Sequence, residues 1–184
     1  MKNKLFLKWL LSFNLVLLAS VFAWIYGIFD RVYIADITKI SFLIYILLII
    51  TSVRIGIDTY KISSTNYFKK MKNKNRQKGE TNITAAMIVA NEYKTRQNQY
   101  DFIANTFVKL GIIGTVIGIS WMLSSVFTGL DPSNISSMQS SIALMGTGLG
   151  TALYTTGAGL ICNLILKIQN FQLSEYIDRE IGNA

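Results

Sequence analysis

Two long uncharged segments, both rich in glycine and threonine, constrain this chain more than any other feature. They are Leu110–Leu130 (LGIIGTVIGISWMLSSVFTGL) and Ile142–Leu166 (IALMGTGLGTALYTTGAGLICNLIL). Each is long enough to cross a bilayer as a helix, which takes roughly 20 predominantly apolar residues. A simple anchor needs no glycine, and each glycine costs a helix about 1 kcal/mol relative to alanine. The glycines therefore predict helices that pack closely against other helices.

Seven glycines in these two segments are the predicted packing positions. Gly114 and Gly118 stand four residues apart, as do Gly146 and Gly150, which is the spacing that lets two membrane helices approach closely. The complete predicted set is Gly111, Gly114, Gly118, Gly146, Gly150, Gly157 and Gly159.

Two further apolar segments predict two more membrane helices, at about Leu5–Phe29 and Ile40–Ile57. The first follows a basic start and so resembles a secretory signal. It is too long for a cleaved signal and no A-x-A site follows it, so we expect an uncleaved transmembrane helix. Arg54 enters near the end of the second, where a long side chain can reach the headgroups.

The distribution of charge predicts the topology. The net charge is +8, and 11 of the 18 Lys and Arg residues fall between Arg54 and Lys109. In a soluble protein this cluster would suggest nucleic-acid binding. In a membrane protein it first marks a cytoplasmic loop, and we expect no nucleic-acid partner. The loops between the first two and the last two spans carry no positive excess, so both chain ends are expected in the cytoplasm.

These observations predict an all-α membrane protein with four transmembrane helices, N-in/C-in, whose helices extend into the cytoplasm. The apolar positions Ile83, Met87, Ala90 and Phe102 predict a helix that runs directly into the third span. The basic cluster is expected to attract anionic lipid headgroups.

The predicted divisions are 1–57 for the first two spans, 58–106 for a basic cytoplasmic helical segment, 107–166 for the last two spans and 167–184 for a cytoplasmic tail.

The residues that are missing exclude several functions. The chain has no histidine and a single cysteine, Cys162, which excludes histidine-based chemistry, histidine-ligated metals and an internal disulfide. No clustered carboxylates occur, so we expect no enzyme, no metal site and no cofactor. The last two spans contain no Asp, Glu, Lys, Arg or His, although these residues are the usual carriers of protons inside a membrane.

Hydroxyl groups are what these two spans offer instead. A single threonine in a membrane helix most often bonds back to its own backbone. Five threonines on two glycine-rich helices favour a polar stripe, with Asn163 on the same helical face as Thr156. The five are Thr115, Thr147, Thr151, Thr155 and Thr156.

Two sequence blocks resemble a known family. Leu110–Gly118, LGIIGTVIG, is similar to the LGLLGTVxG signature of the MotA/TolQ/ExbB proton-channel subunits. Thr151–Asn163, TALYTTGAGLICN, resembles that family's ALLTTxxGxxxAN segment and is closest to its MotA-like form. The order and spacing of the two blocks also fit.

The resemblance implies a ring, a homopentamer in a bacterial inner membrane, whose third and fourth helices line a central pore while the first two are peripheral. Helices of an ExbD/TolR/MotB-like single-span partner, expected as a dimer, would thread this pore. Each helix would carry an intramembrane aspartate along which protons or sodium ions pass. Thr115 and Thr156 match the family's ion-path threonines, and with Thr151 and Thr155 they form the predicted pore-lining set.

The chain departs from the family pattern at two places. Thr151 stands where the TolQ/ExbB branch often has a glutamate, and ICNLILK lacks the proline that usually follows in the fourth helix. The middle loop is short beside that of flagellar stators, so a TolQ/ExbB-like energiser or another relative within the family fits better.

Two other functions remain open at this point. The chain could be a four-helix membrane scaffold or assembly protein whose glycines serve packing only. It could also form a channel by itself, although no charged or carbonyl-rich selectivity element supports this. A neighbouring gene for a single-span protein with an N-terminal aspartate would favour the motor.

Overall fold

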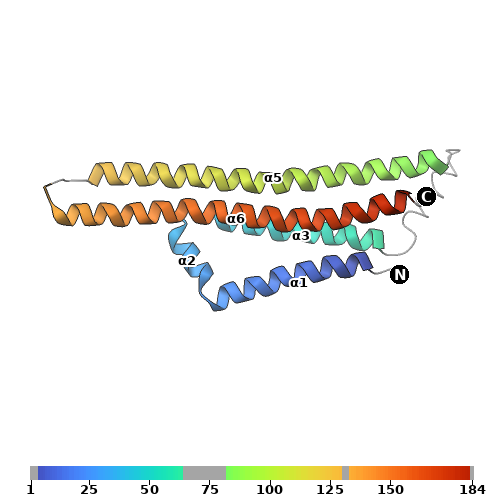
Figure 1. Ribbon diagram of the computed structural model, residues 1–184, viewed down its shortest axis with the longest axis horizontal. Coiled ribbons are helices and arrows are strands. Elements are labelled where there is room, and N and C mark those ends of the chain that lie inside the picture. The colour runs from blue at the N-terminus through green and yellow to red at the C-terminus, as the bar shows by residue number, and fades with distance from the viewer. Residues whose placement is uncertain (1–3, 64–81, 130–132, 183–184) are drawn as a thin grey trace. The chain divides into compact units, whose positions relative to one another are not determined.

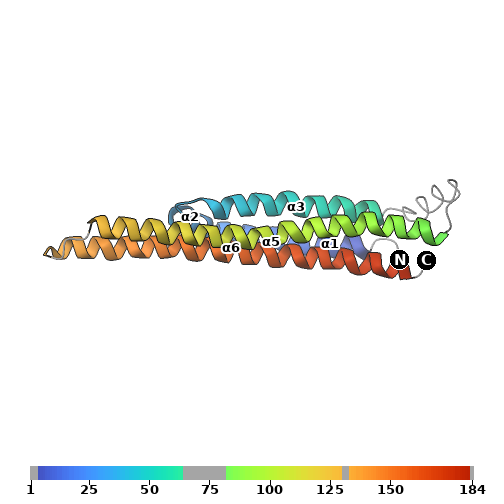
Figure 2. The same cartoon turned by 90° about the horizontal axis from the view of Figure 1, so that it is seen from above.

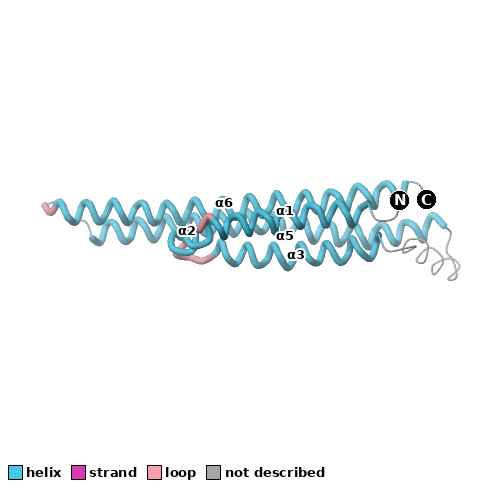
Figure 3. Tube along the Cα trace, turned by 90° about the horizontal axis from the view of Figure 1, so that it is seen from below, coloured by secondary structure: helices cyan, strands magenta, loops and turns pink. Residues whose placement is uncertain are grey.

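The computed structural model describes residues 4–63, 82–129 and 133–182, and these are helical apart from short turns (Figures 1 and 3). The helices are α1 (Lys4–Ile25), α2 (Ile28–Ala35), α3 (Ile40–Ser63), α5 (Asn82–Gly129) and α6 (Ile135–Gly182). Four of them, α1, α3, α5 and α6, contain segments long and apolar enough to cross a membrane. The predicted all-α membrane fold with four spanning helices is therefore confirmed. The sequence also predicts turns at the basic stretch KKMKNKNRQKGE and at Asp131-Pro132. Both segments, and the side chains of Ile83, Met87 and Ala90, lie outside the described residues.

The first predicted span, Leu5–Phe29, is wrong at its C-terminal end. Helix α1 stops at Ile25, and Gly27 takes the left-handed conformation with φ 64° and ψ 23°. Only glycine adopts this conformation without a steric cost, so the helical hydrogen-bond ladder ends here. Helix α2 begins at Ile28, so residues up to Ala35 are helical where a loop was expected.

The other helices are longer than their apolar segments. Helix α3 extends to Ser63, six residues past the predicted span. Helices α5 and α6 each contain 48 residues. At 1.5 Å per residue, such a helix is about 72 Å long, while the hydrocarbon core is about 30 Å thick. The expected helical continuations, before the third span and after the fourth, are confirmed, and α6 runs unbroken where the family proline is missing.

The chain forms two compact units, which we describe separately. Unit 1 comprises Met1–Leu18, Ile49–Ala104 and Ile165–Ala184, and unit 2 comprises Ala19–Leu48 and Asn105–Leu164. Helices α1, α3, α5 and α6 each contribute residues to both units. The predicted functional threonines all belong to unit 2.

The core of unit 1 combines apolar and polar side chains. Its apolar part includes Ile55, Leu166 and Leu173. Helix α1 contacts α3 through Trp9. The indole lies against Gly56 of α3, where an added Cβ would come within 2.1 Å of the ring. Gly56 therefore makes the room in which the Trp9 ring packs on α3.

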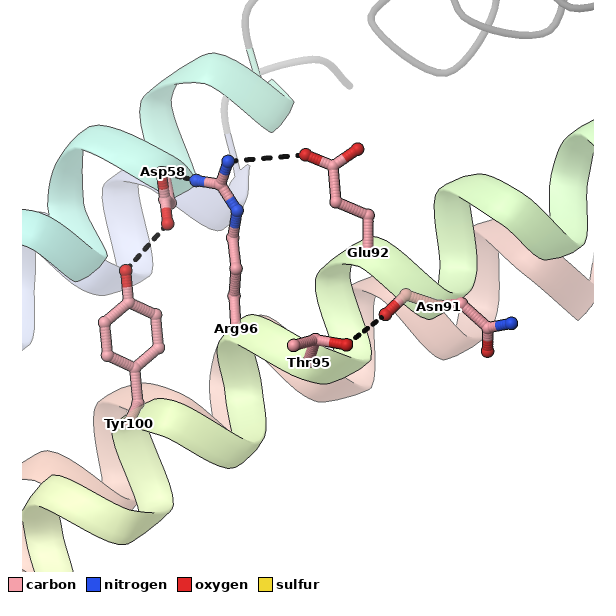
Figure 4. A network of polar contacts seen from close by, with 6 residues as sticks. All are labelled: Asp58, Asn91, Glu92, Thr95, Arg96 and Tyr100. Atoms are coloured by element: carbon pink, nitrogen blue, oxygen red, sulfur yellow. Dashed lines mark hydrogen bonds and ion pairs between the residues drawn. The ribbon is translucent and has the colours of Figure 1, made fainter.

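A polar cluster connects α3 to α5 within unit 1 (Figure 4). Asp58 of α3 is buried, and both of its carboxylate oxygens are used. Arg96 donates to Oδ1 at 3.0 Å, and the Tyr100 hydroxyl donates to Oδ2 at 2.7 Å. Arg96 also reaches Glu92, one helical turn earlier on α5, at 3.3 Å. The buried carboxylate is thus paired and hydrogen-bonded, as burial of a charge requires.

Candidate functional site

Thr115 of α5 and Thr156 of α6 form a hydroxyl pair between the two glycine-rich helices. Their Oγ1 atoms are hydrogen-bonded to each other. Thr115 Oγ1 also lies 3.0 Å from the carbonyl oxygen of Gly111 and 3.3 Å from that of Ala152. A hydroxyl has one hydrogen to donate and two lone pairs to accept with, so each group can change its partner by rotation. Both side chains are half-buried.

Glycines bring the two helices close enough for this pair to form. A Cβ at Gly159 would lie 2.6 Å from the Phe107 carbonyl oxygen, and one at Gly114 would lie 2.7 Å from Thr155 Cβ and Oγ1. Gly111 and Gly118 are nearly as crowded, with backbone atoms at 3.0 Å and 3.2 Å. Larger residues would push α5 and α6 apart, and the cross-helix hydroxyl contact would be lost.

The remaining predicted packing glycines lie elsewhere. A Cβ at Gly150 would meet Ala35 of α2 at an ordinary 3.8 Å. A Cβ at Gly146 or Gly157 would meet nothing of the described chain within 4 Å. These two positions therefore have no close helix neighbour among the described residues, and their packing role stays a prediction about other subunits.

Thr151 and Thr155 are completely buried inside unit 2. Thr155 Oγ1 bonds back to its own helix, 3.0 Å from the Thr151 carbonyl oxygen. Thr151 Oγ1 donates to the Ala35 carbonyl and accepts from the Ile37 amide at 3.3 Å. Both views in Figures 1 and 2 place α2 beside α6, where this contact forms. Thr151 therefore fastens the turn between α2 and α3 to α6.

Asp36 shapes the turn that Thr151 holds, and the sequence reasoning gave it no role. The side chain is fully buried, yet each oxygen has partners. The Thr38 amide and hydroxyl donate to Oδ1 at 3.1 and 2.7 Å, and the Ser41 amide donates to Oδ2 at 2.9 Å. The spacing Asp-x-Thr-x-x-Ser ahead of an apolar run is the sequence signal that could have identified this turn.

The site contains hydroxyls and amides rather than titrating groups. Asn163, seven residues after Thr156, is half-buried, and its Nδ2 has no hydrogen-bond partner among the described residues. Within residues 4–63, 82–129 and 133–182, no group of three or more His, Cys, Asp and Glu side chains could hold a metal ion. The arrangement can bind and orient water or a protonated group, but the two glycine-rich spans contain no Asp, Glu, Lys, Arg or His in unit 2.

Residues 60–183 match the model of the MotA/TolQ/ExbB proton channel family. The chain belongs to the MotA/TolQ/ExbB proton channel family. The resemblance found in the sequence is therefore confirmed, and the match extends well upstream of the two glycine-rich blocks. No curated protein and no solved structure matches the chain.

Membership of the MotA/TolQ/ExbB family fixes the function at a coarse level. The protein is a multi-pass membrane protein of a proton channel family, which is concerned with transport rather than enzymatic chemistry. The Thr115–Thr156 pair lies within the matched residues, on helices that carry no charge in their apolar segments.

Proposed function

We propose that this protein is the ring subunit of a motor in a bacterial inner membrane that is driven by the proton- or sodium-motive force. Five copies surround a pore, and a dimeric single-span partner of the ExbD/TolR/MotB kind places its intramembrane aspartates there. The chain ends and the basic segment between α3 and α5 face the cytoplasm, because loops rich in Lys and Arg are retained on that side.

The observation that carries this proposal is the Thr115–Thr156 hydroxyl pair. Its two members come from different helices, are bonded to each other and remain half-buried, so they can still reach a group outside the protomer. Hydroxyls can both donate and accept, which suits them to a neighbour that alternates between carboxylate and carboxylic acid. A pore wall without charge needs such a titrating neighbour, and a partner aspartate supplies it.

Thr151 and Thr155 take a different part in this proposal. Both are fully buried in the protomer, so their side chains hold the wall together instead of lining the pore. Thr151 fixes the α2–α3 turn, and Thr155 fills the space beside Gly114. The lining role is assigned to Thr115 and Thr156 alone.

A replacement of Thr156 by valine tests this assignment. Thr156→Val keeps the shape of the side chain and removes the hydroxyl, so the ring should assemble while ion-driven work is abolished. Thr147→Val is the matched control, because Thr147 is exposed and its hydroxyl donates back to its own helix, at 2.9 Å from the Ala143 carbonyl oxygen. A cell-based assay of the driven process, made together with the native mass of the complex, gives both readouts.

The native mass of the complex, extracted in mild detergent with the products of the neighbouring genes, tests the ring itself. A pentamer carrying a smaller single-span protein is expected. A monomer or dimer without a companion would favour the scaffold function instead. Normal activity of T156V in an intact ring would refute the site assignment but leave the ring standing.

A further inference from the structure

Asp101 and Asn170 form a second polar contact between α5 and α6, this one in unit 1. Asn170 is 5% exposed, and its Nδ2 donates to Asp101 Oδ1 at 3.1 Å and to the Gln97 main-chain oxygen at 3.3 Å. One helical turn further along α6, Ser174 Oγ donates to the Gln97 side-chain oxygen at 3.5 Å. The Gln97 side chain is thereby held at the same helix interface, while Asp101 itself is exposed.

Two buried atoms of this group have no hydrogen-bond partner among the described residues. They are Asn170 Oδ1, an acceptor, and Gln97 Nε2, a donor. Leaving such an atom unsatisfied is unfavourable, because burial removes the hydrogen bonds that it makes to water in the unfolded chain. Internal water molecules commonly satisfy groups of this kind and make about three hydrogen bonds each. A water molecule has the lone pairs to accept from Gln97 Nε2 and the two hydrogens to donate to Asn170 Oδ1 and to the Asp101 carboxylate.

The positions of these residues along their helices relate them to the threonine pair. Thr156, Asn163 and Asn170 follow each other at intervals of seven residues on α6, so they share one helical face. Asp101 precedes Thr115 on α5 by 14 residues, or two intervals of seven, so these two residues also lie near one helical face. Asp101 also lies nine residues, or about 14 Å of helix, before the apolar segment that begins at Leu110.

We propose that Asp101, Asn170 and Gln97 form a water-holding proton-release site between α5 and α6 in unit 1, on the cytoplasmic side of the apolar segments. This inference rests on the proposed function. A proton that reaches the bound water passes to the Asp101 carboxylate, and the water is left neutral. The exposed carboxylic acid then gives the proton to cytoplasmic water, which restores the carboxylate. Asn170 acts as a positioning residue, because its Nδ2 holds Oδ1 of Asp101 at the interface.

The simpler explanation is an interhelical hydrogen bond that only fixes the register of α5 and α6. The two roles respond differently to Asp101→Asn, since an asparagine side-chain oxygen can still accept from Asn170 but the amide cannot carry a proton away. Asp101→Glu restores the carboxylate. Asp178→Asn is the matched control, because it removes an exposed carboxylate from α6 in the same unit.

The experiment measures proton uptake into vesicles that contain the whole complex, purified with its companion subunits, using a pH-sensitive dye and a potassium diffusion potential. We expect D101N to lower the flux at least about tenfold, since a positioned proton acceptor contributes about 10²–10⁴-fold to a proton transfer. Its native mass should not change, D101E should recover most of the flux, and D178N should match the wild type.

Three results would overturn the inference. A D101N flux within about twofold of wild type would leave only the register role, since a contribution of 10²–10⁴-fold would be missing. A loss of flux together with loss of the ring would assign Asp101 to packing. A wild-type complex that carries no protons at all would refute the proposed function itself, and this is seen before any variant is compared.

Discussion

At the scale of single residues, the hydrogen atom that serves as the side chain of Gly159 sets the distance between α5 and α6. A Cβ there would meet the Phe107 carbonyl oxygen at 2.6 Å and Gly111 Cα at 3.3 Å. The nearest contact is with backbone, which cannot move aside as a flexible side chain can. Gly157, two residues away on the same helix, has no described atom within 4 Å of the same added carbon.

This difference makes the two glycines a matched pair for a stability experiment. Gly159→Ala should lower the free energy of unfolding by about 1–3 kcal/mol, as overpacking of a tight interface does. Gly157→Ala should be neutral or stabilise by up to about 1 kcal/mol, because alanine is the better helix former. Unfolding in mixed detergent micelles, followed by circular dichroism, measures both. Equal stability of the two variants would show that α5 and α6 are not in close contact at Gly159.

At the scale of helices, the polar cluster around Asp58 attaches α3 to the part of α5 that precedes the third span (Figure 4). Tyr100→Phe removes the hydroxyl that donates to Asp58 Oδ2 and leaves a buried oxygen short of one partner. A hydrogen bond to a charged group contributes about 1.5–3 kcal/mol, so we expect a loss of that size in the free energy of unfolding.

Tyr60→Phe is the control for this prediction. It removes the same atom from an exposed tyrosine on α3, where the change should stay within about 0.5 kcal/mol. If Y100F proves as stable as Y60F, the cluster does not hold α3 and α5 together.

The sequence predicted the long helices well and the turns poorly, for a physical reason. Apolar length and glycine spacing are local properties, so the membrane segments of α3, α5 and α6 could be placed from them. The break at Gly27 depends on one residue's backbone conformation inside an otherwise continuous apolar run, which periodicity does not register. The role of Thr151 depends on Ala35 and Ile37, more than 110 residues away in the chain. Burial of Thr151 and Thr155 likewise follows from packing, while the sequence placed both in the predicted pore-lining set.

At the scale of the whole molecule, one face of α6 in unit 2 remains uncovered by the described residues. Gly146, Leu153 and Gly157 share this face, since their spacings of seven and four residues follow the helical repeat. Leu153 is 74% exposed, and neither glycine has a described neighbour within 4 Å of an added Cβ. A lipid-facing surface gains nothing from glycine, whereas an approaching helix needs it. In the proposed ring, the neighbouring copy is the helix that would use this face.

Gly157→Leu therefore separates folding of the protomer from assembly of the ring. Leucine has free space at this position within one chain and is a better helix former, so helical content and thermal midpoint should be kept. The same side chain would block a close helix approach, so the native mass should fall below that of the ring. Gly159→Leu should instead destabilise the protomer itself, because its added carbons meet the α5 backbone. A G157L complex of unchanged mass would mean that lipid, and not a second copy, covers this face of α6.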